Sequence, residues 1–206
     1  VLVTVGSGTS GVGGAIVADA GRSTVHTGGA VHLSSGEGTA TSSGAITIRS
    51  INSGTAGVSG ALVFSSGTAV SGNSGAIEIG TGAATAGRGG MVLVSVGSGT
   101  SGAGGAVAVD AGRSTVHTGG AVHLASGEGT ATSSGAITIR SINSGTSGVS
   151  GMLVFSSGTA QGGNSGAIEI GTGAATAGRG GMVLVTVGSG TSGVGGGLTV
   201  DAGRST

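Results

Sequence analysis

Residues 15–44 read AIVADAGRSTVHTGG followed by AVHLSSGEGTATSSG, and this stretch contains the pattern that decides the fold. Each half, here called a line, has fifteen residues, begins with apolar residues at its second and fourth positions, and ends in glycine. Residues two apart in an extended chain lie on the same face. Each line is therefore predicted to begin with a short β-strand, and a glycine-rich turn is predicted to follow.

The lines form a longer repeat. Four more follow at 45–60, 61–75, 76–90 and 91–105, and the first of these has sixteen residues. Six lines make a unit of 91 residues, because VLVTVGSGTSGVGG at residue 1 returns in nearly the same form at residues 92 and 183. We expect one continuous segment over residues 1–206, part of a longer array, with repeat units 1–91, 92–182 and 183–206, the last partial.

The expected fold is all-β: a β-solenoid of about 15-residue coils, with six coils in each 91-residue unit. Large residues of the first strand would face the small residues at positions nine and eleven across a thin two-sheet core. Glycines would make the corners, where a positive φ is needed. Coils stacked about 4.8 Å apart would give an amyloid-like cross-β arrangement.

Composition limits the function classes. Glycine supplies 52 of 206 residues, Pro, Cys, Trp and Tyr are absent, and the formal net charge is zero. A chain without a basic stripe or an aromatic platform is a poor nucleic-acid binder. No apolar run is long enough to span a membrane. Apolar residues also recur regularly along this chain, whereas disordered segments are usually poor in apolar residues and rich in charge.

One motif invites a nucleotide-binding interpretation. The glycines of Gly6-x-Gly8-x-x-Gly11 have the spacing of a dinucleotide-binding turn. Such a turn requires a helix directly after it, whose N-terminus faces the phosphate. The next apolar line begins near Ala15, so there is no room for a helix. The absence of lysine also excludes a P-loop.

No catalytic, cofactor-binding or metal-binding residue is predicted. In the coil interpretation His26 and His32 lie on different sheets, and His32 and Glu78 lie three coils apart, about 14 Å. That separation is too long for shared metal coordination. We expect no enzyme activity and no cofactor.

A threonine column and two charge pairs are the candidate surface features. The threonines between the small residues are predicted to point outward, as a glycan or ice-binding face: Thr24, Thr39, Thr55, Thr85, Thr100, Thr115, Thr130, Thr146, Thr176 and Thr191. Arg22 with Glu37, and Arg113 with Glu128, would lie side by side as ladder ion pairs. No Asn-x-Ser/Thr sequon is present, while O-glycans on the threonines remain an open alternative.

Lines such as SGAITIRSINSGTAG and SGAIEIGTGAATAGRGG resemble the Gly/Ser/Thr-rich tandem arrays of microbial surface and matrix proteins. The resemblance implies an extracellular or cell-surface filament that assembles with itself, end to end and laterally, and has no assigned activity. The threonine column has a weaker resemblance to β-solenoid antifreeze proteins. An ice-binding or adhesin-type solenoid is therefore the alternative function.

Overall fold

The computed structural model describes residues 2–204, and this part of the chain contains neither a helix nor a β-strand. The expected all-β solenoid, its two-sheet core and its amyloid-like stacking are therefore wrong. A strand ladder needs backbone hydrogen bonds between neighbouring lines. Among residues 2–204, every backbone–backbone hydrogen bond instead joins two glycines of the same line.

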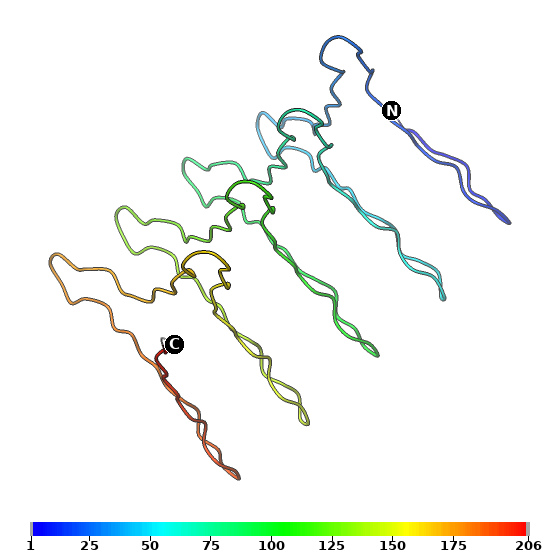
Figure 1. The fold of residues 1–206 in the computed structure, drawn as a ribbon. Helices are drawn as coiled ribbons and strands as arrows, with labels where there is room; N and C mark the ends of the chain where they lie inside the picture. Colours follow the sequence, from blue (N-terminus) through cyan, green and yellow to red (C-terminus); the bar gives the residue numbers. More distant parts are fainter. Residues whose placement is uncertain (1, 205–206) are drawn as a thin grey trace. The chain divides into compact units, whose positions relative to one another are not determined.

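The period of the lines appears in the structure as a series of bends. Bends lie at 9–11, 24–26, 39–41, 55–56, 70–72, 85–87, 100–102, 115–117, 130–132, 146–148, 161–163, 176–178 and 191–193. Their starting points are 15 residues apart, or 16 where the line has sixteen residues. Figure 1 shows the result: the chain runs out along narrow arms and returns beside itself. We call the bend of each arm its tip.

The base of an arm, here called its neck, is closed by glycine. In the line 15–29, the backbone N–H of Gly29 donates to the carbonyl oxygen of Gly21, with N···O 2.8 Å. The same eight-residue spacing joins Gly44 to Gly36 at 3.0 Å. It recurs in the corresponding lines at Gly14–Gly6, Gly105–Gly97, Gly120–Gly112, Gly135–Gly127 and Gly196–Gly188.

The glycine that ends each line is also placed against the sixth residue of that line. A Cβ added at Gly44 would lie 3.4 Å from the Cβ of Ser35, and one added at Gly90 would lie 2.9 Å from the Cβ of Thr81. A Cβ at Gly105 would overlap Cγ1 of Val96. Glycine at the line end therefore lets the returning chain pass close to the outgoing one.

Glycines near the tips have a different role from the one expected. None of the described glycines has a positive φ, so the corners do not require left-handed backbone. Gly38 is needed for space, because a Cβ there would overlap the carbonyl oxygen of Ser42 and lie 2.8 Å from its carbonyl carbon. The small residues at position nine accordingly fit a tight turn rather than the inner face of a sheet.

The described residues form no buried core, and all of them are exposed except Gly38 and Gly129, which are intermediate. The chain's accessible surface is 20130 Å². A compact monomer of 18.4 kDa would expose about 8,200 Å², and its unfolded chain about 27,000 Å². The single chain thus keeps most of its apolar side chains in water.

Contacts divide the chain into two units, Val1–Ala106 and Val107–Thr206. The boundary falls after the first residue of the line 106–120, and each unit by itself contains the same kinds of arm, tip and neck.

Candidate functional site

The tips hold the predicted threonine column. Thr24, Thr39, Thr55, Thr85 and Thr100 are each the first residue of a bend, and each is exposed. The other predicted members hold the same place: Thr115, Thr130, Thr146, Thr176 and Thr191. Thr9 also begins a bend, while Val70 and Gln161 take this place in the remaining two arms. The threonines therefore lie at the turns of most arms, and not on the outer face of a sheet.

Hydroxyl groups elsewhere in the arms bind the backbone. Ser23 accepts a hydrogen bond on Oγ from the backbone N–H of His26 at 2.9 Å, and Ser114 does the same for His117. Thr81 Oγ1 donates to the carbonyl oxygen of Gly90 at 3.3 Å, in a line without a Gly–Gly neck bond. The side-chain hydrogen bonds of residues 2–204 are all of this local kind.

The sixteen-residue lines contain a shallow hollow. Arg49, Ser50, Ile51 and Asn52 line a space of about 150 Å³, and the same four residue types line its counterpart at 140–143. Each hollow is formed by four consecutive residues, and none of their side chains is buried. It is a local fold of the exposed chain, without the enclosing walls of a ligand pocket.

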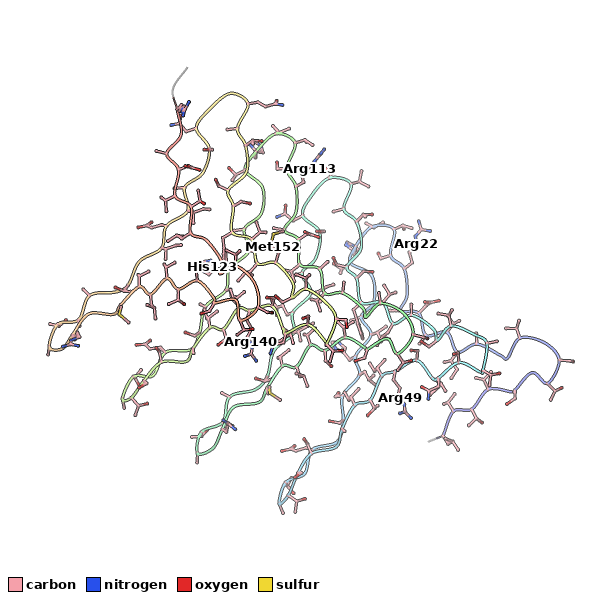
Figure 2. The ribbon with its side chains drawn as sticks, turned by 90° about the horizontal axis from the view of Figure 1, so that it is seen from below. Arg22, Arg49, Arg113, His123, Arg140 and Met152 are labelled. Carbon is pink, nitrogen blue, oxygen red and sulfur yellow. The ribbon has the colours of Figure 1, made fainter. Side chains whose placement is uncertain are left out.

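The predicted charge pairs are not brought together by a hydrogen bond. Arg22 and Glu37 precede the tips of two successive arms, and no side-chain hydrogen bond of the described residues joins them. The same holds for Arg113 and Glu128. Figure 2 shows Arg22 and Arg113 extending away from the ribbon. The alignment of each pair was predicted from the stacking of solenoid coils, and the described residues form no such stack.

The most extensive feature is apolar. Positions one to four of each line, here called the apolar segments, carry large hydrophobic side chains that are at least 49% exposed. Ile46 and Ile48, for example, are 49% and 53% exposed. Figure 2 shows side chains standing off the ribbon along the arms. Soluble monomers rarely expose apolar surface on this scale, and such surface is typical of an interaction site.

The described residues offer no cluster for metal binding. No group of three or more His, Cys, Asp or Glu residues within 2–204 could hold a metal ion. His26 lies at a tip, whereas His32 lies on an apolar segment. The glycines of the nucleotide-like motif belong to an arm, with Gly6 at its neck and Gly11 at its tip. No helix in this part of the chain could cross a membrane.

Comparison with known proteins supplies no relative: no protein-family model, curated protein or solved structure matches the chain.

The sequence interpretation missed the neck. Its signal was present, because glycine occupies position seven in five of every six lines and the last position in all of them. Two glycines eight residues apart were assigned to two separate corners of a coil. In three of those five lines the structure instead joins them by a backbone hydrogen bond.

Proposed function

We propose that this chain is a structural protein that assembles with copies of itself into an extracellular filament or matrix fibre, without catalytic activity. The observation that carries the proposal is the repeated exposure of apolar segments on a chain that buries none of its large hydrophobic side chains among the described residues. The extracellular location is supported by the resemblance to microbial surface and matrix arrays.

The energetics favour association. Burying the exposed half of one Val, Leu, Ile or Phe side chain is worth roughly 1 kcal/mol. Ordering glycine-rich backbone costs about as much for every residue fixed, so a single segment gains too little to hold a complex together. A chain with two such side chains in nearly every line can bury many segments at once, and linked contacts strengthen each other.

Charge does not oppose this association. The chain carries seven arginines and seven acidic residues, so copies do not repel one another through a net charge. The near-identical units offer the same surface every 91 residues. A surface that repeats along the chain can extend an assembly without limit, because each added copy presents the next set of segments.

The test is the size of the assembled protein. We expect the purified chain to sediment as particles much larger than 18.4 kDa, and electron microscopy to show elongated assemblies that grow with protein concentration. Dissociation by moderate urea should return the single chain, because urea weakens apolar association.

A chain that remains monomeric at high concentration would contradict the proposal. If such a monomer also lowered the freezing point of its solution without changing the melting point, the ice-binding alternative would replace it. A monomer that adheres to cells or to polysaccharide would instead favour the adhesin-type alternative.

A further inference from the structure

We infer that the tip threonines are acceptors for O-linked sugars, so that each arm with a threonine at its tip presents a glycan there. The inference deepens the proposed function, because it rests on the extracellular location given there. It identifies which hydroxyls of this Ser- and Thr-rich chain a glycosyltransferase can reach.

Position distinguishes these threonines from the others. A transferase must take the acceptor hydroxyl into its own active site, so the acceptor has to lie on exposed chain that can enter a cleft, as loop tips do. Thr24 and Thr39 each begin a bend and are exposed. Thr47 lies instead on an apolar segment, between Ile46 and Ile48, where the proposed assembly would cover it.

The tip hydroxyls are also available. None of the side-chain hydrogen bonds in the described part of the chain uses Thr24, Thr39 or another tip threonine. Thr81 differs, since its Oγ1 donates to the carbonyl oxygen of Gly90. A hydroxyl held by the neck of its own arm is a poorer acceptor than one that faces water.

The residues after the tip threonine are mostly small. Thr39 is followed by Ala40 and Thr100 by Ser101 and Gly102, so little bulk obstructs an approaching enzyme. The donor would be a sugar activated through a phosphate, either nucleotide-linked or lipid-linked. Threonine Oγ1 forms the new bond to the anomeric carbon, the bond from that carbon to the phosphate oxygen breaks, and the hydroxyl proton passes to a base of the transferase.

The experiment is peptide mass spectrometry on the protein isolated from cells that naturally produce it. Cleavage after arginine gives residues 23–49 as one peptide, which contains Thr24, Thr39 and the internal control Thr47. The peptide 50–88 contains Thr85 together with the control Thr81. Fragmentation that preserves the sugar bond assigns each added hexose or N-acetylhexosamine to a residue.

We expect sugar on Thr24, Thr39 and Thr85, and none on Thr47 or Thr81. A T24V/T39V variant produced in the same cells should lose the sugar assigned to residues 24 and 39 while it still assembles. Unmodified peptides, or sugar on Thr47 as often as on the tips, would overturn the inference. Because assembly is measured on the unglycosylated chain made in other cells, failure of this inference is distinguishable from failure of the proposed function.

Discussion

Gly29 donates its backbone N–H to the carbonyl oxygen of Gly21, with N···O 2.8 Å, and Gly120 and Gly112 repeat this bond at the same distance 91 residues later. The bond closes an arm within a single line. It also uses backbone groups that a strand ladder between lines would need, since each residue has one N–H to donate. In the lines that carry it, this local closure takes the place of a bond between neighbouring coils of a β-solenoid.

Replacing Gly38 by Ala is expected to open the tip of its arm. The added Cβ would lie 2.8 Å from the carbonyl carbon of Ser42 and 3.2 Å from the carbonyl oxygen of Thr41. Relief of such overlap costs about 1–3 kcal/mol. The Gly44 N–H to Gly36 bond should then weaken, which the chemical shift and exchange rate of the Gly44 amide would report.

Gly36→Ala is the matched control for Gly38→Ala, because a Cβ at Gly36 meets nothing within 4 Å. We expect the Gly44 amide of this variant to behave as in the unmodified chain. Equal changes in the two variants would show that backbone entropy, and not the close approach at Gly38, determines the effect.

Ser23→Ala is expected to loosen the bend at 24–26. The Oγ atom that accepts from the His26 N–H at 2.9 Å is lost, which costs at most about 0.5–1.5 kcal/mol because water can replace it. The amide resonance of His26 should shift toward that of an unstructured peptide. Ser34→Ala, which removes a hydroxyl without a hydrogen bond in the described residues, should leave His26 unchanged; no shift in either variant would contradict the assigned turn.

Replacing both Phe64 and Phe155 by Ser is expected to weaken assembly. Each of the two residues is 64% exposed in the single chain, and burying a Phe side chain is worth up to about 1.5–3 kcal/mol. The concentration needed for assembly should rise at least tenfold, since 1.4 kcal/mol corresponds to a factor of ten. Sedimentation over a concentration series measures this.

V70T is the control for the Phe64 and Phe155 substitutions. Val70 begins a bend and is exposed, and Thr is the residue found at most other tips. Because the tips stay in solvent in the proposed assembly, this variant should assemble at the same protein concentration as the unmodified chain. A loss of assembly equal to that of the Phe variant would indicate that copies associate through the tips instead.

Assembly is expected to strengthen on warming from 5 to 25 °C on the order of a few-fold, because apolar association is driven by entropy near room temperature. It should change little when salt is added, since salt screens only the charge–charge contribution. Light scattering at several temperatures and ionic strengths checks both expectations. Assembly that dissolves on warming or in salt would indicate polar or ionic contacts instead.

Sequence reasoning predicted the period of this molecule and not its hydrogen bonding. The apolar beginning and glycine end of the line that contains Gly21 and Gly29 recur throughout the chain, and their spacing matches the spacing of the bends. The alternation at Ile46 and Ile48 suggested a sheet, but alternation describes faces and does not supply a partner strand. The glycine at position 38 suggested a corner with a positive φ. The structure has no positive φ there, and requires only that this residue has no Cβ close to the carbonyl group of Ser42.

Of the candidate surface features, likewise, the sequence predicted one kind and not the other. Thr24 and its equivalents were identified as exposed from the small residues around them, and the structure places them at bends. The partnership of Arg22 with Glu37 depended on the stacking of coils and could not be read from the sequence alone. Which surface an exposed chain uses for assembly depends on contacts that a single copy does not make.

The most direct test of the central claim is hydroxyl-radical footprinting of the protein in its assembled state and after dissociation by urea. Met152 and Phe155 lie on an apolar segment and are exposed in the single chain, whereas His26 and His117 lie at tips. The account predicts that assembly protects Met152 and Phe155 several-fold and leaves both histidines as reactive as before. Equal labelling of Met152 and Phe155 in the two states would contradict assembly through the apolar segments.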